Sequence, residues 1–175
     1  MKTINYYMKS GQITKDDSYK NLSEKFLDKA RENLTTMSIL SDLNNNPKIK
    51  DLLKIPDNYD SNEWVVICGY YAIYTSALAL LAKIGFRSKN HAATLLILEE
   101  FFVKKKLLDK KSFLLLKNVA FHKEDIERIS NAKNKREIAQ YSITKQTTKD
   151  IAERIKQNAY DFVNKCDDVL RLIKK

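Results

Sequence analysis

Five long segments of the chain carry apolar residues at the spacing of an α-helix. The first runs from about Asn21 to Leu43, and steps of three or four residues separate its apolar positions. Those positions are Leu22, Phe26, Ala30, Leu34, Met37 and Leu40. Asn21 and Glu24 have the spacing of a capping box at its start, and Pro47 follows its end. The sequence therefore predicts a first long helix here.

The second segment is the most apolar part of the chain, and it follows a short helical turn predicted over residues 48–54. Asp60 and Glu63 repeat the capping pattern at its start, and Gly85 stands where a left-handed residue closes a helix. One face holds Trp64, Ile67, Tyr71, Tyr74, Leu78 and Leu81. Because apolar residues occupy most sides, we expect a buried central helix and not a membrane span.

Three more helices are predicted after Gly85. The third covers about residues 89–105, and its inward residues are Ala92, Leu95, Leu96, Leu98 and Phe102. The fourth covers about residues 110–132 behind the cap Asp109, and its stripe is Leu115, Val119, His122, Ile126 and Ile129. The last opens at residues 147–150. Its stripe is Ile151, Ile155, Ala159, Phe162, Cys166, Val169 and Ile173.

The order of these segments predicts an all-α protein. The 175 residues include 3 glycines and 2 prolines, too few for the turns of an all-β fold. Residues 1–19 are polar and lack periodicity, so we expect a loose N-terminal arm. Residues 20–175 form one domain, and the short connections favour an antiparallel up-down bundle of four to five helices.

The formal net charge of +10 is concentrated in one part of the chain. Residues 104–136 contain eleven basic and four acidic side chains, which is +7 of the total. Such an excess attracts phosphates without sequence specificity and is compatible with RNA binding. The alternative is a lysine-rich face that water covers.

The sequence offers no catalytic constellation of a familiar kind. Cys68 and Cys166 lie on apolar stripes, as expected for core thiols in a reducing cytosol. Two histidines and two cysteines lack the close spacing of metal ligands, so we expect neither a metal nor a cofactor. The neighbours Glu99 and Glu100 are expected to diverge around a helix as surface acids.

Two histidines and one arginine remain as candidates. His122 lies within the stripe of the fourth helix and is typical of a satisfied core or interface histidine. His91 follows Arg87 and Lys89 and is typical of an exposed helix start. Either histidine could act as an acid or base near neutral pH. Arg136 lies in the polar segment 131–142, where we expect an exposed loop.

Several of these segments together resemble the HEPN family of small helical domains. Residues 26–30 are similar to its first helix, and residues 64–74, with their tyrosine pair, resemble its second helix. Residues 89–91 continue the likeness, and Arg136 to Tyr141 resembles the Arg-x-x-Ala-x-Tyr element of the family. The resemblance covers about residues 20–175.

The resemblance implies a helical bundle that often forms a homodimer. Many HEPN proteins are metal-independent ribonucleases in toxin–antitoxin or defence systems, and others lack activity and pair with a small nucleotidyltransferase. In the nucleases an arginine is followed after four to six residues by a histidine. Here the fifth residue after Arg136 is Tyr141. A tyrosine with a pKa near 10 is a poor base at pH 7, so the nuclease motif is not intact.

We therefore expect a cytoplasmic HEPN-type module that binds RNA, a nucleotide or a protein partner. Its candidate binding residues are Arg87, Lys89, His91, Lys133, Lys135 and Arg136. The alternative is a ribonuclease toxin whose degenerate site combines Arg136, Tyr141 and His122, or His91, across a homodimer. The third possibility is a structural component. Tyr70, Tyr71 and Tyr74 offer more aromatic surface than one inward face holds, which favours a two-fold homodimer.

Overall fold

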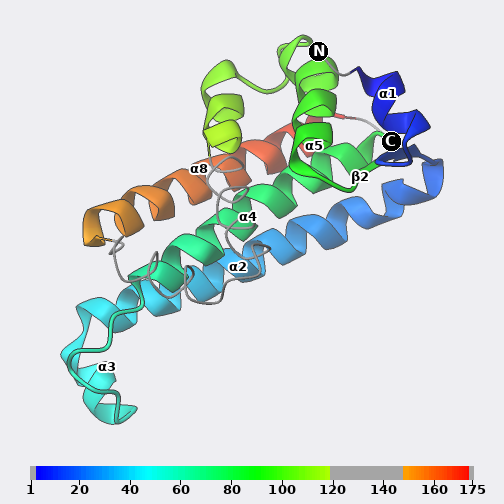
Figure 1. The fold of residues 1–175 in the computed structure, drawn as a ribbon. Coiled ribbons are helices and arrows are strands. Elements are labelled where there is room, and N and C mark those ends of the chain that lie inside the picture. The colour runs from blue at the N-terminus through cyan, green and yellow to red at the C-terminus, as the bar shows by residue number, and fades with distance from the viewer. Residues whose placement is uncertain (1–2, 119–147, 174–175) are drawn as a thin grey trace, which may run out of the picture.

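The structure is a computed structural model that describes residues 3–118 and 148–173 (Figure 1). The protein is mostly α-helical, as the sequence predicts. Its elements in chain order are α1 (Ile4–Lys9), β1 (Ile13–Lys15), the 3₁₀ helix η1 (Asp17–Leu22), α2 (Ser23–Asn45), α3 (Pro47–Leu52), α4 (Asn62–Lys83), β2 (Phe86–Ser88), α5 (His91–Leu98), the π-helical turn η2 (Glu99–Val103) and α8 (Lys149–Leu172). Residues 110–118 are also helical.

Helix α4 lies between α2 and α8, and this central position confirms the prediction for the most apolar segment (Figure 1). The Ser23 hydroxyl donates to the Ala79 carbonyl at 3.0 Å, and the Ser61 hydroxyl donates to the Leu40 carbonyl at 2.7 Å. These two bonds join opposite ends of α2 and α4, so the two helices are antiparallel. Helix α8 runs in the same direction as α4 and antiparallel to α2.

Gly69 lets the neighbouring helices approach α4 closely. A Cβ atom at this position would lie 2.7 Å from Ile155 Cγ2 on α8 and 3.1 Å from Met37 Sδ on α2. Both distances are shorter than ordinary van der Waals contact, so any side chain here would push the helices apart. The small residue therefore stands at the point where the three long helices meet.

The buried face of α4 differs from the stripe that the spacing selects. Trp64 is 55% exposed and Tyr71 is 41% exposed. Leu81 of that stripe is buried as predicted, and the other residues that fill the core are Val65, Tyr70, Ala72, Ile73, Ser76, Ala77, Ala79, Leu80 and Ala82. The prediction fails because a helix that is apolar on most sides has no polar face to mark its outward direction.

Helix α4 is also long and apolar enough, by length and composition alone, to cross a membrane. Within the fold, 61% of its most apolar stretch is buried. Core helices of water-soluble proteins meet the same criterion, so this helix is weak evidence for a membrane.

The prediction of a loose arm over residues 1–19 is wrong. This segment forms α1, β1 and the start of η1, and Ile13 is 1% exposed. Strand β1 pairs antiparallel with β2, with Thr14 opposite Arg87. The sequence pattern missed the strand because its partner lies more than 70 residues away and each strand has 3 residues. A pairing between such distant short segments leaves no local periodicity.

Three helix boundaries and the short helix α3 agree with the sequence, whereas neither predicted capping box forms. At the box predicted from Asp60 and Glu63, α4 begins at Asn62 after Ser61 and has no side-chain cap. Helix α3 forms, Gly85 has a φ of +78°, and Asp109 and Thr148 cap the helices that follow them. The capping box at Asn21 is wrong. Asn21 belongs to η1, and no side-chain cap is found at Leu22, the described residue that precedes α2. The predicted inward position of Ala92 is also wrong, because Ala93 and Ile97 point inward instead.

Candidate nucleic-acid interface

Three of the predicted site residues lie within the described part of the chain: Arg87, Lys89 and His91. The other predicted residues lie outside it. They are His122, Lys133, Lys135, Arg136 and Tyr141. The structure therefore brings together one corner of the predicted site, formed where β2 leads into α5.

The β1–β2 ribbon sets the direction of Arg87. Alternate residues of a strand point to opposite faces, and Ile13 and Phe86 are buried on the inner face. Arg87 is exposed on the outer face, and Lys89 is exposed just beyond the strand. Within the described residues, neither side chain has a hydrogen-bond or ion-pair partner. Both cations are therefore open to an anionic ligand.

His91 is buried, and the prediction of an exposed helix start is wrong. Its Nε2 atom forms a hydrogen bond with the Tyr70 hydroxyl, and its ring stacks on Tyr74 with 4.4 Å between ring centroids. The cap of α5 is instead Asn90, whose side-chain oxygen accepts from the Ala93 N–H at 2.8 Å. Since Asn90 satisfies the helix end, His91 turns toward α4 and is 8% exposed.

A chain of polar contacts continues from this histidine to the strand. The Tyr74 hydroxyl lies 3.3 Å from Thr94 Oγ1, which in turn lies 2.6 Å from Ser88 Oγ. The Thr94 hydroxyl also lies within donating distance, 3.0 Å, of the Asn90 carbonyl oxygen. We call Tyr70, Tyr74, Ser88, His91 and Thr94 the tyrosine–histidine network. This network holds the corner from which Arg87 and Lys89 extend, so its role is positioning.

Exposed lysines surround the end of the third predicted helix. The lysine cluster consists of Lys104, Lys105, Lys106, Lys110 and Lys111, and all five side chains are exposed. A hydrogen bond with Glu100, supported by its charge, raises the pKa of Lys104. Lys105 Nζ lies 5.6 Å from the centroid of the Phe101 ring. The five lysines form a second basic surface.

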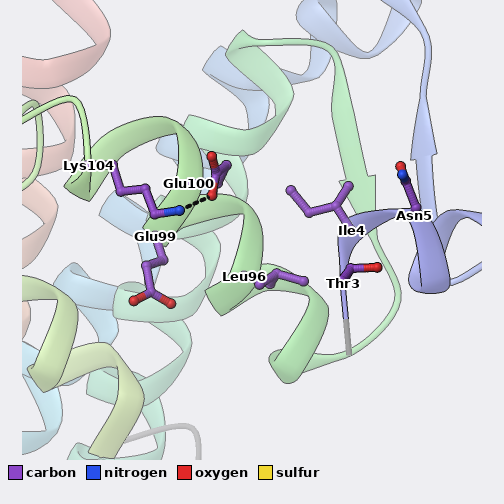
Figure 2. Close-up of a pocket in the computed structure, with 7 residues that line it drawn as sticks. All are labelled: Thr3, Ile4, Asn5, Leu96, Glu99, Glu100 and Lys104. Carbon is purple, nitrogen blue, oxygen red and sulfur yellow. Dashed lines mark hydrogen bonds and ion pairs between the residues drawn. The ribbon is translucent and has the colours of Figure 1, made fainter. Parts of the chain in front are cut away.

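A pocket of about 410 Å³ lies between α1 and the end of α5 (Figure 2). Its lining residues are Thr3, Ile4, Asn5, Leu96, Glu99, Glu100 and Lys104. The backbone N–H of Lys104 donates to the backbone carbonyl of Glu99, five residues earlier, at 3.0 Å. Both glutamates are exposed and contribute to the pocket lining, and their side chains point in opposite directions (Figure 2), so the expectation that they diverge around the helix as surface acids is confirmed. A single π-helical turn inside a helix is frequent at functional sites.

The two cysteines have no features of reactive thiols. Cys166 is fully buried, and desolvation raises the pKa of its thiol to about 12. Burial also raises the pKa of Cys68, which is half-buried. The prediction of core thiols is confirmed for Cys166. Among residues 3–118 and 148–173, no group of three or more histidine, cysteine, aspartate or glutamate side chains could hold a metal ion.

Sequence reasoning missed the pocket and the tyrosine–histidine network. The π turn has no signature in the sequence, and the pocket needs α1, which the polar composition of residues 1–19 concealed. The network could have been suspected from Tyr70 and Tyr74, which are four residues apart and share a helix face.

Comparisons of the chain with protein-family models, with curated proteins and with solved structures found no match.

Proposed function

We propose that the protein is a HEPN-type helical module that binds RNA, with Arg87 and Lys89 on the phosphate backbone. The observation that carries the proposal is the exposure of these two cations on one side of the β2–α5 corner, without acidic partners among the described residues. Guanidinium and ammonium groups in this state pair readily with phosphate oxygens. The net charge of +10 favours the same class of ligand.

The environment of His91 favours binding over catalysis. A general acid or base must come within about 3 Å of the proton that it moves. His91 is enclosed by Tyr70 and Tyr74 and is engaged on its Nε2 atom, so it is not presented to a strand bound at Arg87. We therefore propose a module that binds RNA without cleaving it. A nucleotidyltransferase-type protein is its proposed partner, and the cytoplasm its proposed location.

A homodimer is part of the same proposal, but the aromatic residues that support it differ from those named in the sequence analysis. Tyr70 and Tyr74 belong to the tyrosine–histidine network inside the fold, so they are not available to a partner. Trp64 and Tyr71 remain exposed, seven residues apart on α4. Two helical turns separate them, which places both on one side of the helix. This pair supports self-association through α4.

Binding of a fluorescein-labelled single-stranded RNA of mixed sequence tests the proposal by anisotropy at low salt. We expect Arg87→Ala/Lys89→Ala to weaken binding by roughly tenfold, because each lost phosphate contact removes a charge-assisted hydrogen bond. The matched control is Lys25→Ala/Arg154→Ala, which removes two exposed cations from α2 and α8. Equal weakening by both pairs would show that only net charge matters. Unchanged binding in the first pair would reject the assigned residues.

A further inference from the structure

The lysine cluster lies at the opposite end of α5 and η2 from Arg87 and Lys89 (Figure 1). The side chains of three of its members, Lys106, Lys110 and Lys111, have no hydrogen-bond or ion-pair partner among the described residues. Five lysines and one aspartate give residues 104–111 a net charge of +4. This segment is therefore a dense group of exposed cations, separate from the β2–α5 corner.

The aspartate of this segment is occupied by the helix that follows it. Oδ1 of Asp109 accepts from the backbone N–H of Ser112, and Oδ2 accepts from the Ser112 hydroxyl, both at 2.8 Å. These bonds lower the pKa of Asp109, and the positive charge of Lys165 on α8 adds to the effect. Lys165 thus places a further cation beside the lysine cluster.

Backbone hydrogen bonds hold the lysine cluster in a fixed turn. The backbone N–H groups of Leu107 and Leu108 both donate to the Phe102 carbonyl, at 2.9 and 3.2 Å. Phe102 and Leu108 are buried in the core. The backbone positions of the lysines are therefore set before a ligand binds, which lowers the entropic cost of binding.

Two of the unpaired lysines occupy positions that are unfavourable in the free protein. Lys106 has a φ of +58°, in the left-handed region where glycine is more stable. Lys111 is the second residue of the helix over residues 110–118, and the positive end of a helix repels a cation. A glycine at position 106 and a neutral residue at position 111 would stabilise the free protein, whereas a bound anion favours the two lysines.

These local costs do not identify a ligand site by themselves, because α3 contains the same two features. Lys48 is the second residue of α3, and Lys54 follows its end with a φ of +55°. Between them, Lys50 Nζ donates to two backbone carbonyls of the next loop, and Asp51 carries a negative charge. Because α3 lacks a dense group of unpaired cations, it provides a matched control.

We infer that the lysine cluster is a second phosphate-binding surface for RNA, an inference that rests on the proposed RNA binding. The Glu100 carboxylate neutralises Lys104, and the Glu99 carboxylate repels phosphate. The contacts therefore fall to Lys106, Lys110 and Lys111. Lysine ammonium groups bind phosphate as point charges, so affinity at this surface should vary little with RNA sequence.

The same labelled single-stranded RNA tests the inference by anisotropy. We expect Lys106→Gly/Lys111→Gln to weaken binding at low salt by roughly tenfold and to make the salt slope shallower by about 1.4, for two lost phosphate contacts. The control Lys54→Gly/Lys48→Gln removes the same charge from equivalent positions and should keep the wild-type affinity and slope. Both pairs should raise Tm by about 1–4 °C. Lower affinity together with a higher Tm does not arise from loss of fold.

The outcomes separate this inference from the proposed function. Wild-type affinity in Lys106→Gly/Lys111→Gln, with weaker binding in Arg87→Ala/Lys89→Ala, would overturn the second surface and leave the proposed function intact. The reverse pattern would support the second surface and reject the residues assigned at the β2–α5 corner. Equal weakening by the test and control pairs, or a lower Tm for the test pair, would also overturn the inference. Absence of binding by wild type at low salt would overturn both proposals.

Discussion

Gly69→Ala tests the close approach of the three long helices by the sign of its effect on stability. In an ordinary helix interior this change stabilises by about 1 kcal/mol, because alanine is a better helix former than glycine. Here the new Cβ atom would lie 2.7 Å from Ile155 Cγ2 and 3.1 Å from Met37 Sδ. Overpacking of this kind costs about 1–3 kcal/mol. The cost exceeds the gain, and we expect a net loss of about 1 kcal/mol.

Thermal unfolding followed by circular dichroism measures this loss. For a chain of this size, about 1 kcal/mol corresponds to a decrease in Tm of about 2–4 °C. The sign should reverse in an Ile155→Ala background, because the Cγ2 atom that the new Cβ meets is then absent. In that background Gly69→Ala should raise Tm. A double-mutant cycle isolates the coupling between the two positions. A higher Tm for Gly69→Ala alone would refute the packing of α8 on α4 at this point.

Three further predictions concern the thiols, self-association and catalysis. Because burial raises the pKa of the Cys166 thiol to about 12, native protein at pH 8 should leave this cysteine unmodified by a thiol reagent, and 6 M guanidinium should expose it; rapid native labelling, mapped by mass spectrometry, would contradict the buried position. Light scattering at micromolar concentration should return a dimer for wild type, and Trp64→Ser/Tyr71→Ser should return a monomer; a monomeric wild type would reject the dimer. Purified protein should leave a mixed RNA substrate intact for hours in a gel assay, with or without divalent metal, whereas efficient cleavage would restore the ribonuclease alternative.

The helices could be predicted from the sequence because their apolar periodicity is local. The starts at Asp109 and Thr148 and the end at Gly85 each depend on the chemistry of one or two residues, and the structure confirms them. The positions of α2, α4 and α8 along the chain follow from the same local patterns.

The features that could not be predicted depend on contacts between distant parts of the chain. Strand β1 is stable because it pairs with β2, and neither strand is long enough to show alternation. His91 is buried because Asn90 takes the helix cap and two tyrosines of α4 receive the imidazole ring. Arg87 and Lys89 are close to His91 in the sequence but are exposed. Closeness in the sequence therefore led to one predicted binding site that contains two exposed cations and one buried histidine.

The exposure of Arg87 and Lys89 follows from their charge, and the structure shows both side chains exposed. Their role in binding stays a prediction. The pocket at η2 has no local pattern, because it needs a π-helical turn in one segment and the N-terminal helix in another. Five predicted residues, from His122 to Tyr141, lie outside the described part of the chain and remain predictions.

The salt dependence of RNA affinity tests the central claim most directly. For single strands, log K falls with log salt by about 0.7 for each phosphate that the protein neutralises. Arg87→Ala/Lys89→Ala removes two such contacts, so its slope should be shallower than that of wild type by about 1.4. The control Lys25→Ala/Arg154→Ala should keep the wild-type slope. Equal slopes for wild type and Arg87→Ala/Lys89→Ala would contradict the claim that these two side chains hold the phosphate backbone.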